Sequence, residues 1–270
     1  MNRYKYIDEK RSHLHTLDGK PLIGTSTVGK VIGGDKIGGL IWWASGMAVS
    51  KLGWLNPKKA TQEERLKAAG NRLGEIEDST TEEYLALLDE AYKAHDKEKM
   101  AKAKIGTKRH ELLEKYVKLM ISDQAGKPHP MNSGYEEIYE FMIWATHNIK
   151  RFLWSELHCY SEKMWTGGIA DVGWEDMEGR IIAGDFKSSK EAYLDQYIQI
   201  AGYDMEISES NGLDRDGNKI FMLEKEIQGY CVVPFGGETL RPELEYDTEK
   251  WKQGFRSALE LHKLSLTYKQ

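Results

Sequence analysis

The sequence has 270 residues, of which 40% are hydrophobic and 30% charged, and its formal net charge is −5. This composition is typical of a folded globular protein and excludes a disordered or fibrous chain. The net charge does not exclude nucleic-acid binding, because a basic groove can lie on an acidic protein.

The cysteine usage and the first residues of the sequence indicate in which cellular compartment the protein is expected. Cys159 and Cys231 lie far apart with no metal-binding spacing, so we expect neither a disulfide framework nor an iron–sulfur cluster. The first residues, MNRYKYIDEKR, are polar and predict no signal peptide. The most apolar early stretch, residues 37–49, is too short to span a bilayer. These features predict a cytoplasmic protein without a membrane segment.

Residues 1–35 are rich in glycine and turn signals and include GTSTVGKV at 24–31, which fits the GxxxxGK pattern of a phosphate-binding loop. Such a loop needs Ser or Thr after its lysine to bind magnesium, and Val31 stands there. The preceding apolar stretch is also short for a strand. We therefore expect a glycine-bearing turn that leads into the first helix.

Helical periodicity dominates from about residue 36 to residue 150. Thr61 and Glu64 have the spacing of a helix-capping box. Trp42 and Trp43 lie in this region, and we expect at least one of them in a core, although aromatic residues there, with Trp54, are also suited to stacking on unpaired bases. The predicted region is an arch-like helical elaboration within a single domain spanning 1–270.

From residue 151 onward the pattern changes to strands. Residues 152–165, 167–176 and 180–187 read as three strands, the last two joined by a tight turn at MEG. A helix over 191–208, two strands over 227–235 and 240–246, and an amphipathic helix over 246–264 follow. This order predicts an α/β fold, a mixed central sheet flanked by helices, with the catalytic core in residues 151–270.

The last of the three strands ends in AGDFKSSK, residues 183–190, where alternation places Asp185 and Lys187 on one face. Hairpin pairing brings Asp171 beside Asp185. Two carboxylates next to a lysine suit a divalent-metal site for phosphodiester cleavage, since hard oxygens hold Mg²⁺ and the lysine orients or deprotonates water or stabilises charge. The alternative is a solvated hairpin with ordinary surface charges.

Three further features strengthen the catalytic interpretation. Glu156 in the preceding strand is a third acid. His110 and Glu114 lie one helical turn apart and face the same way. In the helix after AGDFKSSK, Gln199 and Tyr203 share a face from which they can contact a phosphate or a base, although such pairs also occur in packing.

Taken in chain order, Gly106-Thr-x-x-His110, Glu156, Gly168-x-x-Asp171, Asp185-x-Lys187 and Gln199-x-x-x-Tyr203 resemble the RecB-like branch of the PD-(D/E)XK nuclease superfamily. That branch includes phage-type recombination exonucleases, mitochondrial genome maintenance exonucleases and CRISPR-associated adaptation nucleases. The resemblance covers roughly residues 105–235, and residues 24–44 are more weakly similar to the segment that opens such exonucleases. It implies a restriction-endonuclease-like core.

The resemblance implies a role for each residue. Catalysis would fall to Glu156, Asp171, Asp185 and Lys187, with Glu162 a competing candidate for the third acid. Two Mg²⁺ or Mn²⁺ ions would be held by His110, Asp171, Asp185 and the carbonyl of Phe186, with Glu114 in support. DNA would be contacted by Gln199, Tyr203, Ser188, Lys108 and Arg109, the last two ending a basic run from Lys99.

Two departures from the family pattern stand out. Ala170 replaces the name-giving proline, and Ser188 replaces the common threonine while retaining a hydroxyl. The missing cysteine cluster argues against the iron–sulfur subgroup. The resemblance predicts an end-dependent DNA exonuclease of recombination, repair or DNA processing, in a bacterial or phage-infected cell, acting alone or with a single-strand annealing or binding protein. A structure- or site-specific endonuclease and a non-catalytic DNA-binding module remain the alternatives.

Overall fold

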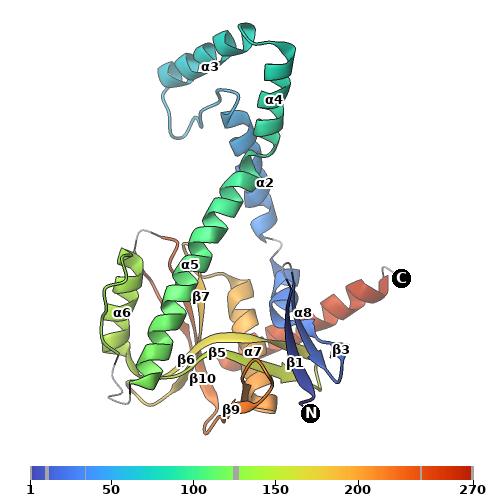
Figure 1. Ribbon diagram of the computed structural model, residues 1–270, viewed down its shortest axis with the longest axis vertical. Helices are drawn as coiled ribbons and strands as arrows, with labels where there is room; N and C mark the ends of the chain where they lie inside the picture. Colours follow the sequence, from blue (N-terminus) through green and yellow to red (C-terminus); the bar gives the residue numbers. More distant parts are fainter. Residues whose placement is uncertain (1, 10–11, 34, 124–127, 238, 269–270) are drawn as a thin grey trace. The chain divides into compact units, whose positions relative to one another are not determined.

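A computed structural model describes residues 2–9, 12–33, 35–123, 128–237 and 239–268 (Figure 1). The chain divides into two compact units. Residues 1–33 and 108–270 form the first, here called the sheet unit, and residues 34–107 form the second, the helical unit. The predicted helical region 36–150 is therefore shared between the units, and residues 124–127 of it lie outside the described residues.

The sheet unit is built on a mixed sheet that has eight strands in the described residues, in the order β11-β10-β7-β6-β5-β8-β9 with β4 beside β6. β10 runs parallel to β7 and β4 parallel to β6, and the other pairs are antiparallel. The strands are β4 (Ile23–Gly24), β5 (Ile149–Ser161), β6 (Thr166–Asp176), β7 (Ile181–Lys187), β8 (Gly212–Leu213), β9 (Lys219–Phe221), β10 (Ile227–Pro234) and β11 (Glu243–Glu245).

Helices flank this sheet, which confirms the prediction of an α/β fold with a mixed central sheet. The helices of the sheet unit are α1 (Thr25–Gly29), the 3₁₀ turn η1 (Lys30–Ile32), α6 (Glu136–Asn148), α7 (Leu194–Ser210) and α8 (Thr248–Tyr268). The helical unit holds α2 (Asp35–Ser50), α3 (Gln62–Glu77) and α4 (Thr81–Tyr92). Helix α5 (Ala94–Ser122) contributes residues 94–107 to the helical unit and 108–122 to the sheet unit.

The two faces of the sheet bury separate apolar clusters, because strand side chains alternate between faces. On β7, Ala183 belongs to the cluster shared with α7 and α8, whereas Ile182 and Phe186 belong to the cluster shared with α5 and α6. β10 alternates in the same way, with Val232 on the first side and Val233 on the second. Helices thus cover both faces of the central strands.

The helical unit has little core of its own. Its buried hydrophobic side chains among the described residues are Ala91 and Ala94. The predicted capping box at Thr61 is present and opens α3. Trp42 is 81% exposed and Trp43 is half-buried, so the prediction that one of them lies in a core is wrong. A small unit buries a smaller share of its surface than a large one, which fits the exposure of these two indoles.

The chain start, predicted to consist of turns, forms a small three-stranded sheet of β1 (Tyr4–Glu9), β2 (Ser12–Leu17) and β3 (Lys20–Pro21). Aromatic and histidine side chains fill its contact with β5. The Tyr4 hydroxyl lies 2.6 Å from Nδ1 of His15 and 3.1 Å from Nδ1 of His158, and the Tyr4 ring stacks on Tyr160.

The GTSTVGKV segment forms β4, α1 and the start of η1, as expected of a helix-leading turn, while Gly34 just beyond it lies outside the described residues. α1 packs against α7, where a Cβ on Gly29 would lie 3.1 Å from the carbonyl oxygen of Asp195. No helix in the described ranges combines the length and the apolarity needed to cross a membrane.

The histidine pair beneath the N-terminal sheet predicts acid sensitivity. Burial lowers the pKa of His15 and of His158 to about 4, so the unfolded chain binds more protons than the folded one between about pH 4 and pH 6.5. The free energy of unfolding should therefore rise with pH across this window and lose roughly 2–3 kcal/mol per histidine as pH falls through it.

Urea unfolding of the wild type and of a His15→Gln, His158→Gln double variant, each from pH 4 to pH 8, measures this slope. In the double variant, the part of the pH dependence that comes from the two histidines should be absent. Buried carboxylates such as Glu206, whose pKa burial raises to about 7, change stability with pH in the opposite direction, but they do so equally in both proteins and drop out of the difference. Equal slopes in the two proteins would contradict the assignment.

Candidate active site

Three acidic side chains from the neighbouring strands β5, β6 and β7 come together beside the end of β7. The β5–β6 register places Glu156 opposite Asp171. The β6–β7 register pairs Val172 with Gly184, which puts Asp185 at the next position opposite Asp171. The two aspartates thus lie side by side, in the arrangement the hairpin pattern predicts.

Asp185 is 0% exposed at the end of β7, where the apolar strand leads it into the interior. The Lys187 ammonium forms an ion pair with Oδ2 of Asp185 and donates a 3.3 Å hydrogen bond to Oε1 of Gln199. Within the described part of the chain, no group donates a hydrogen bond of regular geometry to either Asp185 oxygen. A buried carboxylate with so few donors is costly, and a bound cation would offset that cost.

His110 on α5 links the acids. Its Nε2 lies 3.0 Å from Oδ2 of Asp171, and its Nδ1 lies 3.9 Å from Oε1 of Glu156. The same Asp171 oxygen accepts a 2.9 Å hydrogen bond from the backbone N–H of Phe186. The carboxylate of Asp171 therefore receives donors from α5 and from β7.

A metal ion can be held where α5 faces β5. One ligand atom each from His110, Glu114 and Glu156 lies within 4.8 Å of the other two, and all three residues are half-buried. The helical spacing of His110 and Glu114 predicted a shared face, but only a supporting part for Glu114. The structure groups Glu114 directly with the histidine, and its carboxylate also pairs with Lys118.

The titration behaviour of the cluster reflects burial, to which the neighbouring acids add. Burial raises the pKa of Glu156 to about 8, and the charge of Asp171 adds to the rise. Burial also raises the pKa of Asp185 to about 7, against the opposing effect of Lys187. Burial alone would lower the pKa of His110, but its hydrogen bond to Asp171 and the surrounding acids raise it to about 9. The site therefore favours an added cation.

Asp171 and Lys187 are the groups that keep their charge. Burial opposes ionisation of Asp171, but the hydrogen bond from His110 and the nearby positive charges lower its pKa below the ordinary value. Burial opposes protonation of Lys187, but the charges of Asp185 and Asp171 raise its pKa. Lys187 is thus a fixed positive charge beside two aspartates.

Glu156 adopts a left-handed backbone with φ of 51°, inside β5. Non-glycine residues rarely take this conformation, which costs of the order of 1 kcal/mol or more. The strain coincides with the residue whose carboxylate reaches His110 and Glu114. Backbone strain of this kind occurs most often at functional sites, where the position of a side chain is held at an energetic cost.

Helix α7, which follows β7, contacts Lys187 through Gln199. Gln199 Nε2 donates a 2.6 Å hydrogen bond to the Tyr203 hydroxyl, so the chain of contacts runs from Asp185 through Lys187 and Gln199 to Tyr203. Tyr203 is buried, and a Cβ at Gly168 would lie 2.5 Å from its ring. Glycine at that position of β6 is therefore required by the close approach of Tyr203.

The other residues predicted to contact DNA, and the alternative third acid Glu162, lie outside the acidic cluster. Ser188 is exposed in the loop after β7. Lys108 and Arg109 lie on α5 just before His110, and both cations lie over the ring of Tyr135. Glu162, the competing third acid, forms a salt bridge with Arg3 instead, so of the two acids Glu156 is the one in the cluster.

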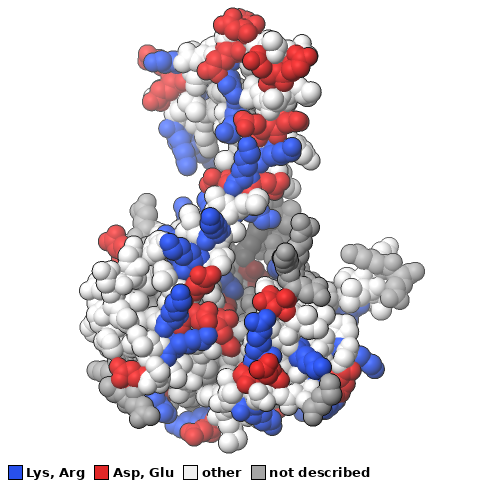
Figure 2. Space-filling view, in the orientation of Figure 1, with Lys and Arg blue, Asp and Glu red and all other residues white. Residues whose placement is uncertain are grey.

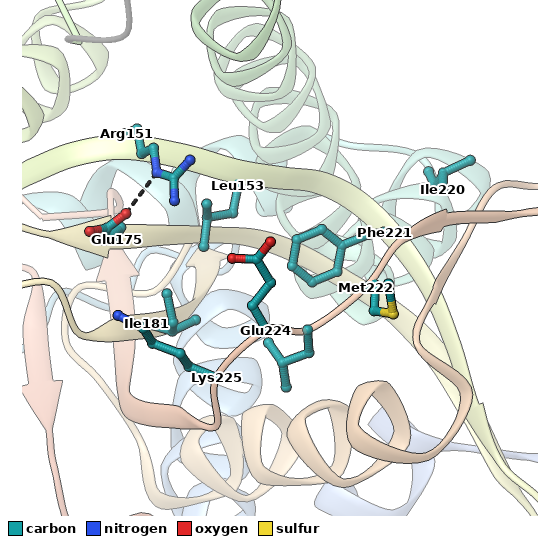
Figure 3. A pocket seen from close by; sticks show the side chains of 10 residues that line it. Arg151, Leu153, Glu175, Ile181, Ile220, Phe221, Met222, Glu224 and Lys225 are labelled. Atoms are coloured by element: carbon teal, nitrogen blue, oxygen red, sulfur yellow. Dashed lines mark hydrogen bonds and ion pairs between the residues drawn. The ribbon is translucent and has the colours of Figure 1, made fainter.

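A separate cavity of about 380 Å³ lies toward the other end of the strands (Figure 3). Glu175 lines it four residues beyond Asp171 on β6, and Ile181 lines it four residues before Asp185 on β7, which corresponds to about 13 Å of strand. Glu175 is paired there with Arg151 and Lys150. It accepts hydrogen bonds from both cations, whereas neither Asp185 oxygen has one of regular geometry within the described residues.

The surface charge is mixed. In Figure 2, Lys and Arg side chains alternate with Asp and Glu over the face that is drawn. A ligand with many phosphates would therefore depend on local cations such as Lys108 rather than on a broad positive field.

The sequence matches no family model and no curated protein.

The strained Glu156 backbone gives a stability test. Alanine normally stabilises a strand interior relative to glycine, but at a positive φ the order should reverse, with Glu156→Gly more stable than Glu156→Ala by about 1 kcal/mol. Urea unfolding of both variants at pH 7 measures the difference. Gly and Ala substitutions at the neighbouring Ser155 serve as the matched control and should show the ordinary order. A more stable Glu156→Ala would contradict the strain.

Proposed function

We propose that this protein is a divalent-metal-dependent deoxyribonuclease that removes nucleotides from DNA ends. The observation that carries the proposal is the buried Asp185 carboxylate near the end of β7, which lacks regular hydrogen-bond donors in the described residues and lies beside Asp171 and Lys187. Carboxylates gathered on neighbouring strands beside a half-buried lysine suit phosphodiester hydrolysis better than they suit structural pairing.

The available donors fit Mg²⁺ or Mn²⁺. Carboxylate oxygens of Glu156, Asp171 and Asp185 are hard ligands, and one imidazole is compatible with Mn²⁺. Burial raises the pKa values of Glu156 and Asp185, and a bound cation would favour their ionised forms. Asp171, Asp185 and the Phe186 carbonyl would hold one ion, and His110, Glu114 and Glu156 would hold another.

Such ions, when bound, activate water and neutralise charge on the phosphate. The chain's own groups supply the rest. Lys187 stays protonated and places a positive charge where the transition state gains negative charge, which favours electrostatic stabilisation over proton abstraction. Gln199 fixes the lysine through Oε1, and the Tyr203 hydroxyl fixes the amide of Gln199 in turn.

The fold supports the same proposal. The element order is helix α6, three antiparallel strands β5–β7, helix α7 and then β10 parallel to β7. We interpret this element order, with acids on β5, β6 and β7, as a restriction-endonuclease-like core. DNA contacts by Ser188, Gln199, Tyr203, Lys108 and Arg109 are part of the proposal, as is a single-strand annealing or binding partner.

The experiment is a cleavage time course with 5′-labelled linear duplex, linear single strand and closed circular DNA, each with Mg²⁺ or with EDTA. We expect loss of the linear substrates only with metal, and survival of the circle. Lys187→Met should lower the rate roughly 10²–10³-fold, because it removes a charge that acts in the transition state.

Lys190→Met, three residues further along and exposed, is the matched control and should cut at the wild-type rate. Cutting of the circle would replace the exonuclease proposal with the endonuclease alternative. Cleavage of no substrate, with DNA still bound, would indicate the non-catalytic module.

A further inference from the structure

We propose that a hollow at the start of α6 receives an unpaired base of the DNA strand that leads to the acidic cluster, a proposal that rests on the nuclease function above. The hollow has a volume of about 390 Å³, within the range of small-ligand pockets. It is lined by residues 130–136 together with Tyr139. None of the side chains assigned above to metal binding or catalysis contributes to this lining.

Two tyrosines give the hollow its aromatic walls. Tyr135 caps α6, and the N–H of Tyr139 donates to the Tyr135 carbonyl at 3.1 Å, so the two residues lie one helical turn apart. Tyr139 is 47% exposed, and Met131 in the same lining is 38% exposed. Accessible aromatic rings are the groups on which unpaired bases stack, without regard to sequence.

Two cations lie against this aromatic wall. The Lys108 ammonium lies 5.6 Å from the centre of the Tyr135 ring, and the Arg109 guanidinium carbon lies 5.8 Å from it. Neither residue lines the hollow itself, and both adjoin it through the Tyr135 ring, where their charges can neutralise phosphates of a strand bound there. Glu136, which also lines the hollow, disfavours a phosphate inside it and is compatible with an uncharged base.

Hydrogen bonds link Arg109, which lies over the Tyr135 ring, to the end of β7. Arg109 Nη1 donates to the carbonyl of Phe235 at 3.5 Å, and the Phe235 N–H donates to the carbonyl of Lys187 at 2.9 Å. Figure 1 shows α6 beside the lower part of α5. Lys108, Arg109 and His110 begin the part of α5 that belongs to the sheet unit, and His110 contacts Asp171, so the residues beside Tyr135 directly precede a member of the acidic cluster in the chain.

The test measures binding rather than cleavage. Fluorescence anisotropy would compare a labelled twelve-nucleotide oligothymidylate with an abasic oligomer of equal phosphate count, in calcium buffer. The wild type should bind the base-containing oligomer roughly tenfold more tightly. Tyr139→Ala should bind both oligomers equally, whereas Tyr139→Phe, which keeps the ring, should retain the preference.

Two further variants separate the contributions. Lys108→Ala should weaken binding of both oligomers alike and reduce the slope of log affinity against log salt by about 1. Tyr268→Ala removes a highly exposed tyrosine from the end of α8 and should behave as wild type. Tyr139 is used in place of Tyr135 because the half-buried Tyr135 packs against the core, and circular dichroism verifies the fold of each variant.

The outcomes distinguish this inference from the proposed function. If the wild type cuts or binds DNA but Tyr139→Ala keeps the full preference for bases, the hollow is not a base site. If the wild type shows no preference for bases, the inference is equally overturned. If the wild type neither cuts DNA nor binds either oligomer, the nuclease proposal itself fails.

Discussion

The burial of one carboxylate, that of Asp185, governs the arrangement at the end of the sheet. The apolar run of β7 carries this acid into the core, where an unpaired charge costs several kcal/mol. The same strand supplies part of the compensation, because Lys187 lies two residues further on the same face. Between them, the Phe186 N–H turns to Asp171. A single strand end thus provides a carboxylate, an amide donor and an ammonium group in succession.

A comparison with the opposite end of the strands shows what sets the cluster apart. Glu175 on β6 accepts hydrogen bonds from both Lys150 and Arg151, and its pKa is lowered by them. Asp185 and Glu156, on the same sheet, have raised pKa values because burial opposes their ionisation, and the charge of Asp171 adds to the rise. The Glu175 carboxylate has cationic donors for both of its oxygens, whereas the Asp185 oxygens can still accept hydrogen bonds or bind a cation. The left-handed backbone of Glu156 is a further cost that stability alone does not explain.

Much of the sheet and of the cluster follows from local sequence signals. The period of two over residues 180–187 and the MEG turn determine the β6–β7 register, and the register alone places Asp171 beside Asp185. Sequence reasoning did not find the N-terminal sheet because its buried side chains mix Tyr4 and His15 with Leu17, so the alternation of apolar and polar residues is interrupted. Glu114 was underestimated because its closeness to Glu156 depends on how α5 packs on β5, a tertiary contact that helical spacing does not encode. The φ of Glu156 has no signal in its residue type.

The claim that most needs a direct measurement is that Asp185 is a metal ligand. Isothermal titration of Mn²⁺ into the wild type, Asp185→Asn and Glu175→Gln at pH 8 addresses it. The account predicts binding by the wild type and by Glu175→Gln, and at least a hundredfold weaker binding by Asp185→Asn, equivalent to about 2.7 kcal/mol. Equal Mn²⁺ affinity in wild type and Asp185→Asn would contradict the assignment of the metal to this carboxylate.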